Sequence, residues 1–134
     1  MRSFLLMAFV ILCVGCDAIK PDNGVQRLGG QKWKLTAIDH KPVNGEGKAY
    51  LEFDEKEMEV AGKAFCNSVK AEYELMGRNQ LTFEEVTSTK MFCDGVMDLE
   101  NQMVTNLQSV RRYEIKNGTL YLYSTDQLLL TFTK

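Results

Sequence analysis

Hydrophobic and polar residues alternate with a period of two along most of the chain. The segment 69–75 shows this most clearly, because every odd position is apolar and every even position is charged. Strict alternation predicts a β-strand that buries one face and exposes the other to solvent. The same alternation indicates about eight strands in all, near residues 33–37, 49–54, 57–61, 69–75, 80–84, 112–116, 120–123 and 128–133.

Turn-forming sequences separate several of these segments. Asn117 and Gly118 stand between the strands near 112–116 and 120–123, and both residue types tolerate positive φ. They give the strongest short hairpin signal in the chain. The stretches 54–56 and 76–79 separate other neighbouring strands. Short connections of this kind predict antiparallel pairing.

One segment departs from the period of two. Between about residues 95 and 109, apolar positions are three or four residues apart, which indicates an amphipathic helix. Asp94 is the expected N-cap, and Asp98 and Glu100 are expected to favour the positive end of the helix dipole. The apolar stripe of this helix consists of Val96, Leu99, Met103, Leu107 and Val110.

Together these elements predict an α+β fold. About eight mainly antiparallel strands form a half-open barrel, with one amphipathic helix at about 95–109 covering one side. An antiparallel sheet of this size has edges to protect, and closing the sheet on itself protects them. The 134 residues leave room for one ordinary domain.

The first sixteen residues have the pattern of an export signal. Arg2 is positively charged, residues 4–14 are all apolar, and the small residue Gly15 precedes Cys16. As a helix, the apolar run rises only about 16 Å, about half the thickness of the hydrocarbon core of a membrane. A transmembrane span is therefore disfavoured, and a buried N-terminal helix is the remaining alternative.

The end of this segment is similar to a bacterial lipobox, in which a small residue precedes a cysteine that becomes the lipidated first residue. The resemblance implies lipidation of Cys16 and a membrane anchor with more than one hydrocarbon tail. We therefore expect a signal peptide at 1–15, a tether at 16–30 and a folded domain at 31–134. The expected location is the bacterial cell envelope.

Composition excludes some functions. The chain has 16 Lys and Arg and 18 Asp and Glu residues, a formal net charge of −2. Without a basic excess, a nucleic-acid binder is not expected. His40 is the one histidine of the sequence and is interpreted as a loop residue.

Several polar groups could carry chemistry, but each also has a structural interpretation that we favour. Ser88 and Lys90 could form a nucleophile pair, yet the hydroxyls of 87–89 are expected to bond backbone groups near the helix start. Two clusters of acidic residues could hold a cation. Solvation of a hairpin also explains the first cluster, which is Glu52, Asp54, Glu55, Glu57 and Glu59. Helix capping also explains the second, which is Asp94, Asp98 and Glu100. No metal site, catalytic residue or cofactor is expected.

Two further sets of side chains have both interpretations. Tyr50, Tyr121 and Tyr123 could form a binding strip, or be ordinary strand residues. The methionines of the domain are expected to fill gaps in the core rather than bind a soft metal. They are Met58, Met76, Met91, Met97 and Met103.

Cys66 and Cys93 remain once Cys13 and Cys16 are assigned to the N-terminal segment. An even pair in an exported chain favours a structural disulfide. A redox pair, a metal-binding pair and two buried free thiols are the alternatives, although the sequence has no C-x-x-C motif.

These cysteines lie in a recognisable context that resembles the META-domain family, which includes the HslJ-like heat-inducible envelope lipoproteins. The resemblance extends from about Gly30 to Lys134. In the family a glycine commonly precedes the first cysteine, whereas this chain has Phe65. The motifs that carry the resemblance are Trp33-Lys34-Leu35, Cys66-Asn67, Thr89-x-Met91-x-Cys93, Glu100 and Leu107 on the helix, and Tyr113-x-Ile115 with Leu120-Tyr121-Leu122.

The resemblance implies an α+β envelope protein without an agreed biochemical activity. We therefore expect a non-catalytic lipoprotein with a stress-related binding or stabilising role, held at the membrane by its lipid anchor. Its partner would be an envelope protein. The alternatives are a carrier of a small apolar ligand inside the barrel, and an inhibitor of an envelope enzyme.

Overall fold

The computed structural model describes residues 27–45 and 47–134 of the chain. The predicted signal peptide and the predicted lipidation site Cys16 lie outside the described residues, so both stay predictions. Among the described residues, no helix is long and apolar enough to cross a lipid bilayer.

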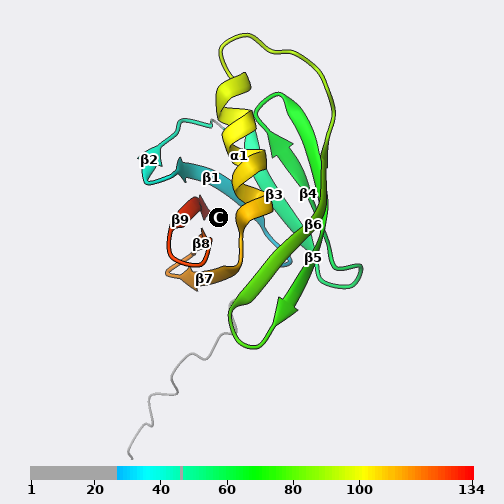
Figure 1. The fold of residues 1–134 in the computed structure, drawn as a ribbon, viewed down its shortest axis with the longest axis vertical. Helices are drawn as coiled ribbons and strands as arrows, with labels where there is room; N and C mark the ends of the chain where they lie inside the picture. The colour runs from blue at the N-terminus through cyan, green and yellow to red at the C-terminus, as the bar shows by residue number, and fades with distance from the viewer. Residues whose placement is uncertain (1–26, 46) are drawn as a thin grey trace, which may run out of the picture.

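The described chain forms nine strands and one helix (Figure 1). The strands alternate in burial as the sequence pattern predicts, most regularly over the first half of β5. In chain order the elements are β1 (Lys32–Ile38), β2 (Lys41–Pro42), β3 (Ala49–Asp54), β4 (Glu59–Ala64), β5 (Asn67–Met76), β6 (Gln80–Ser88), α1 (Met97–Ser109), β7 (Arg112–Lys116), β8 (Thr119–Tyr123) and β9 (Leu128–Thr133).

All strand pairings are antiparallel, and they run almost completely around a ring. The order is β1-β3-β4-β5-β6-β7-β8-β9, and β9 pairs with β1, while β2 adds to the end of β1. The ring is weakest between β6 and β7, which pair only at Gln80 and Arg112. Helix α1 lies over this opening, between β4–β6 on one side and β7–β9 on the other (Figure 1). The predicted half-open barrel with one helix is therefore confirmed.

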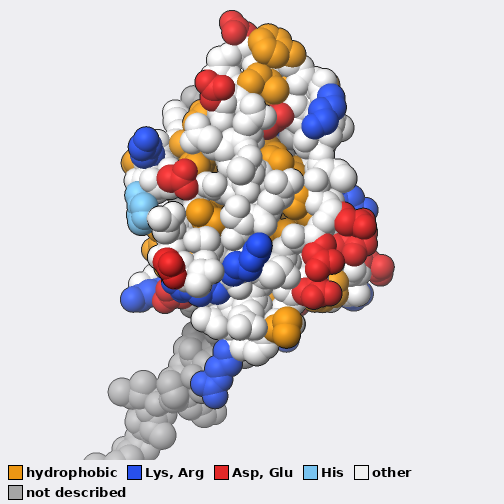
Figure 2. All heavy atoms as spheres, viewed as in Figure 1, with side chains coloured by type: hydrophobic (Ala, Val, Ile, Leu, Met, Phe, Trp, Pro, Cys, Tyr) orange, Lys and Arg blue, Asp and Glu red, His pale blue; other side chains and the backbone are white. Residues whose placement is uncertain are grey.

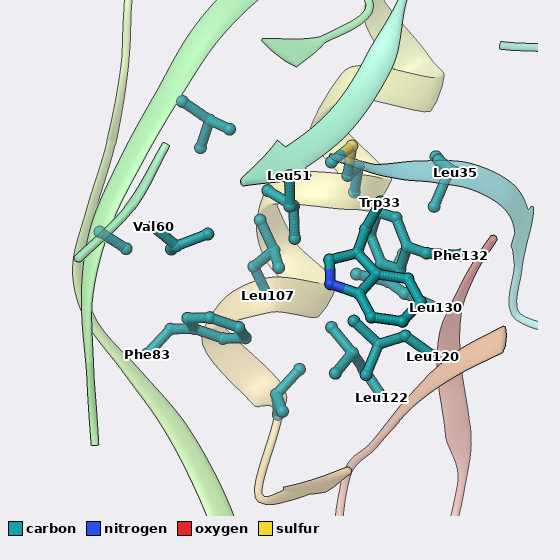
Figure 3. Packing of buried hydrophobic residues seen from close by; sticks show 14 of the residues in the cluster. Trp33, Leu35, Leu51, Val60, Phe83, Leu107, Leu120, Leu122, Leu130 and Phe132 are labelled. Carbon is teal, nitrogen blue, oxygen red and sulfur yellow. The ribbon is translucent and has the colours of Figure 1, made fainter. Parts of the chain in front are cut away.

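The interior of the barrel is filled by its own side chains. Trp33 and Phe132 are fully buried, and the labelled side chains in Figure 3 converge on one apolar centre between the strands and α1. The indole Nε1 of Trp33 donates a hydrogen bond to the carbonyl of Leu28 at 2.8 Å, which satisfies the one polar atom of that ring. Leu28, in the segment predicted as a tether, is itself buried in this core.

The helix begins later than predicted. Its first residue is Met97, its N-cap is Val96, and no side chain caps it, so the prediction of Asp94 as N-cap is wrong. Gly95 has a φ of +80°, which turns the chain before the helix starts. Met103 and Leu107 are buried as the stripe predicts, and Val110 is buried just after the last turn.

Two details of the strands also differ from the prediction. β2 has only two residues, too few for any alternation to be visible. Met58 was expected within a strand, but it lies in the turn before β4 with a φ of +55°. The expectation that the methionines fill the core holds for Met103 and is wrong for Met58, Met76 and Met91, whose side chains are exposed.

Candidate functional site

A disulfide joins Cys66 to Cys93, with their Cα atoms 5.8 Å apart. Cys66 lies in the tight turn between β4 and β5, and Cys93 lies in the segment that leads from β6 into α1. The bond therefore ties this connecting segment to one end of the sheet. Among the interpretations of Cys66 and Cys93 that the sequence left open, the structure contains the favoured one, a disulfide.

Glu100 lies directly beneath this bridge. Its side chain is only 4% exposed, although it is a carboxylate on the first turn of α1. The carboxylate accepts hydrogen bonds from the backbone N–H groups of Cys66 (3.1 Å) and Asn67 (2.8 Å), and from Nδ2 of Asn67. A buried carboxylate is costly unless its oxygens are satisfied. Here three donors from one turn of the sheet satisfy it.

Asn67 extends this network to the connecting segment. Its Nδ2 donates to the carbonyl of Met91, and its Oδ1 accepts from the backbone N–H of Met91 at 2.7 Å. The side-chain amide thus binds Met91 on both backbone groups, as a neighbouring strand would. Oδ1 also accepts from the hydroxyl of Thr89 at 2.8 Å. Asn67 is 1% exposed, and all its side-chain hydrogen-bonding groups are used.

The segment 89–93, which we call the clamped loop, is therefore held at its start, middle and end. Thr89 bonds Asn67 and Ser68, Asn67 binds Met91, and the disulfide binds Cys93. The side chain of Phe92, between the last two attachments, is nevertheless 79% exposed, and that of Met91 is 58% exposed. Figure 2 shows apolar side chains gathered at the end of the molecule where α1 begins. A fixed backbone thus presents two large apolar side chains to solvent.

A groove of about 350 Å³ separates the clamped loop from α1. Met91 and Phe92 form one wall, and Met97, Asn101 and Val104 form the other. Glu100 and Asn67 lie at its floor with their polar atoms already bonded to protein. The groove is also lined by Lys90 and by hydroxyl groups, so its surface mixes thioether, aromatic, amide, hydroxyl and ammonium groups, which suits recognition of a partner.

Glu100 has a role that the sequence analysis did not predict. It lies in the first turn of α1 with Asp98, as expected, but it is buried, whereas Asp94 and Asp98 are exposed. A signal was present, because position 100 precedes Met103 by three and Leu107 by seven and so belongs to the buried stripe. Within the described residues no group of three or more His, Cys, Asp or Glu side chains could hold a metal ion.

The hydroxyls of Thr87 and Thr89 bond to strand β5 rather than to the start of the helix. The Thr89 hydroxyl accepts from the N–H of Ser68, and the Thr87 hydroxyl donates to the carbonyl of Lys70. The expectation that they satisfy backbone groups is confirmed, but the expected location is wrong. The cause is that β6 runs up to Ser88, so Thr87 lies in the sheet and Thr89 directly follows it beside β5.

The acidic residues of the β3–β4 hairpin bind nearby backbone N–H groups and lysine side chains. Oδ1 of Asp54 accepts the backbone N–H groups of Lys56 and Glu57, and these hydrogen bonds lower the pKa of Asp54 below its ordinary value. Glu52 pairs with Lys32 at 3.3 Å, and Glu59 pairs with Lys70 at 3.0 Å. Glu55 accepts the N–H of Gly29.

The three tyrosines do not form a continuous strip. Tyr50 is on β3, whereas Tyr121 and Tyr123 are on β8, and strands β1 and β9 lie between them. Tyr50 stacks under Lys32 and Tyr123 under Arg112. Burial and the nearby Glu114 raise the pKa of Tyr123. His40, with a φ of +64°, lies in the turn between β1 and β2, as expected for a loop residue.

A family model described as the META domain matches residues 26–134. The chain belongs to the META domain family. This confirms the resemblance drawn from the cysteine motifs, and the match begins at residue 26, shortly before the buried Leu28. No curated protein matches the chain significantly.

Three solved structures share the fold of this META domain. One NMR structure is 24% identical, with a TM-score of 0.63, and the match covers 79% of this chain and 90% of the other. An NMR structure of a protein from Burkholderia xenovorans is 19% identical, with a TM-score of 0.64 and coverage of 79% and 82%. A crystal structure of a DUF4847 family protein from Bacteroides vulgatus is 11% identical, with a TM-score of 0.59 and coverage of 79% and 93%. At these identities the likeness is one of fold.

Phe65 is where this META domain departs from the glycine common in its family. The residue has a φ of +64°, in the left-handed region that favours glycine. Its side chain is nevertheless buried in the core. The turn that directs the N–H groups of Cys66 and Asn67 at Glu100 therefore keeps the backbone conformation that a glycine would adopt, and the phenylalanine adds apolar packing.

Proposed function

We propose that this META domain is a non-catalytic, lipid-anchored protein of the bacterial envelope that binds a protein partner through the clamped loop in a stress-related role. The observation that carries the proposal is the exposure of Phe92 and Met91 on a backbone held by Asn67 and the disulfide. Burying a phenylalanine side chain contributes about 1.5–3 kcal/mol. A loop that is already fixed loses little further entropy when a partner covers it.

The position of the loop supports a partner other than the anchoring membrane. The described chain enters the fold near the β3–β4 turn, where Gly29 pairs with Phe53 and bonds Glu55. The clamped loop lies at the other end of β4, beside the β4–β5 turn. A chain anchored at Cys16 would therefore enter the domain at the end away from Phe92.

Photo-crosslinking in living bacteria tests the proposal. A photoreactive amino acid replaces Phe92 in one variant and Met76 in a matched control, because Met76 is also a largely exposed apolar residue, at 62%, but lies in the β5–β6 hairpin. We expect one discrete protein adduct from position 92 and none from position 76. Adducts with lipid alone, or the same smear from both positions, would contradict the proposal.

Two further measurements test the other parts of this function. Cys16→Ser should move the protein from the membrane fraction to the soluble fraction and abolish incorporation of a labelled fatty acid. In a strain lacking the gene, wild-type protein should restore survival under heat and detergent stress, while Phe92→Ser should not. Turnover of a hydrolase or thiol-oxidoreductase substrate by the purified protein, abolished by a point substitution, would refute the non-catalytic assignment.

An inhibitor of an envelope enzyme is the second candidate, and the clamped loop also favours it. A rigid projecting loop can enter an enzyme cleft with little change of shape. Inhibition of a cell-wall hydrolase or envelope protease by the wild type, lost in Phe92→Ser, would select this candidate. The alternative of an apolar-ligand carrier is disfavoured, because Trp33, Phe132 and their neighbours occupy the barrel interior.

A further inference from the structure

A second hollow, of about 510 Å³, lies on the outer face of strands β3–β6, away from the core. Its floor is Ala61 and Gly62 on β4. Across the strands, Glu52 pairs with Ala61 and Ala61 pairs with Lys70, so a small side chain stands between two long ones. Glu52 and Lys70 are two strand spacings apart, about 10 Å. The hollow thus forms because Ala61, between Glu52 and Lys70 on the outer face of the sheet, has a small side chain.

Gly62 allows the backbones of β3 and β4 to lie close together at the floor of the hollow. A Cβ at this position would lie 1.9 Å from the carbonyl oxygen of Tyr50, so the backbone of β4 approaches β3 too closely for any side chain. A substitution at Gly62 would push the two strands apart. Ala61, in contrast, is exposed and points out of the sheet, so its side chain can be enlarged without disturbing the core.

The walls of the hollow combine one aromatic ring with hydroxyls and balanced charges. The Tyr50 ring lines one side, and Lys32 lies over it at 4.1 Å. The hydroxyls of Tyr50, Ser68 and Ser88 make no hydrogen bond to any protein group that the structure describes. Each charged group that lines the hollow has a partner of opposite sign, Lys32 for Glu52 and Glu59 for Lys70.

We infer that this hollow binds a neutral saccharide. Free hydroxyls, a carboxylate and an ammonium group offer both donors and acceptors to a polyhydroxylated ligand. The ring of Tyr50 offers an apolar face to the C–H side of a sugar ring. The strand faces of small barrels bind oligosaccharides in other folds. The volume lies within the range of ligand-sized pockets.

The same features exclude other ligand classes. Because the lining charges are paired, no unpaired positive charge lines the hollow for a phosphate or another anion; Lys63 pairs across the strands with the lining residues Tyr50 and Ser68 but does not itself line the hollow. A lipid tail would need an enclosed apolar cleft, whereas this hollow is open to solvent on the outer face of the sheet. The hollow adjoins the groove beside the clamped loop at Ser88 and Thr89, but Phe92 does not line it, so the inference does not depend on the proposed function.

Backbone amide NMR of the full-length chain, in a detergent without a sugar headgroup, tests this inference. The probes are the neutral tetramers of N-acetylglucosamine, glucose in β-1,4 linkage and glucose in α-1,4 linkage, with tetragalacturonic acid as the anionic comparison. We expect at least one neutral tetramer to shift the amides of Gly62 and Lys70 in a saturable manner. The amides of β8 should not move.

Substitutions locate the site. Ala61→Leu fills the hollow, and Tyr50→Ala removes its aromatic wall; each should weaken binding at least about tenfold. Tyr121→Ala is the matched control, because it removes an outer-face tyrosine on a strand that does not line the hollow. An unchanged melting temperature of Ala61→Leu shows that the fold is intact.

The outcomes separate clearly. Saturable shifts by a neutral tetramer, lost in Ala61→Leu and retained in Tyr121→Ala, support the site. No shift by any neutral tetramer, shifts that survive Ala61→Leu, or binding of tetragalacturonic acid alone would each overturn it. Loss of binding in Tyr121→Ala to the same extent as in Tyr50→Ala would also overturn it, because the effect would not come from the hollow.

Discussion

Replacing Glu100 by alanine should destabilise the domain more than any other single change of a charged residue in the described chain. The substitution removes the acceptor of three hydrogen bonds, from two backbone N–H groups and from the Asn67 amide. Those donors stay buried within one turn of the sheet, and Asn67 in turn holds Met91. One change on α1 therefore reaches the clamped loop through contacts 33 and 34 residues away in sequence.

The expected loss of unfolding free energy follows from the hydrogen-bond donors that the substitution leaves unpaired. Each buried donor without an acceptor costs about 1–3 kcal/mol, so three would cost about 3–9 kcal/mol if the site stayed dry. Glu100 also lines the groove beside α1, so water can reach some of these donors. We therefore expect a loss of about 3–4 kcal/mol, a large part of the 5–15 kcal/mol that stabilises a typical domain.

Urea denaturation with the disulfide intact measures this loss. Glu100→Gln keeps the shape and one acceptor but places an NH₂ group against a donor, so it should lose about 1–3 kcal/mol. Asp98→Ala is the matched control: it is an exposed acid in the same first turn of the helix. It should lose no more than about 1 kcal/mol through the helix dipole. If Glu100→Ala unfolded at the same urea concentration as Asp98→Ala, the reasoning about the buried network would be refuted.

Three other predictions concern the turns and the bridge. Replacing both Cys66 and Cys93 by serine opens a connection of 27 residues and should cost about 3.5 kcal/mol in urea unfolding; an unchanged midpoint would contradict this. Phe65→Gly loses a buried ring, worth about 3–5 kcal/mol, and relieves a positive φ, worth about 1–2 kcal/mol. It should therefore be destabilised, but less than Phe65→Ala, and the reverse order would exclude strain at this turn. The lowered pKa of Asp54 means that its hydrogen bonds stabilise the fold above its ordinary pKa and are lost as the pH falls through the lowered value. Asp54→Asn should therefore differ from the wild type in thermal stability at neutral pH and converge with it in strong acid; a gap that is independent of pH would contradict this.

The period of two identified most of the strands because each of them exposes one face to solvent and buries the other. β5 is the clearest case, since its odd positions from Val69 to Tyr73 are buried and its even positions are exposed. The pattern fails where local conformation, not burial, sets the element. β2 is two residues long, and Gly95 turns the chain before the helix can begin. Neither feature leaves a periodic trace.

Which residues meet across the fold was harder to predict than which face they take. Tyr50 and Tyr121 were considered as parts of one binding strip, but strands β1 and β9 lie between their strands in the sheet. Glu100 shares the register of the buried stripe, yet its partners come from a turn that no helical period can reveal. The exposure of Met91 and Phe92 likewise follows from the contacts of the clamped loop, and composition alone favoured burial of the methionine.

Two attachments of the clamped loop, the Asn67 amide and the disulfide, have different effects because they hold different parts of it. The amide of Asn67 pairs with the backbone of Met91 and needs Glu100 to be oriented, whereas the disulfide holds Cys93 whatever the state of that network. A loop needed only for stability could bury Phe92 against the helix, since the groove beside it is already lined by Met97 and Val104. Instead both attachments fix the backbone and leave the ring in solvent. Loss of either attachment should therefore weaken partner binding through loss of preorganisation, and loss of Phe92 through loss of contact area, which a comparison of association and dissociation rates can separate.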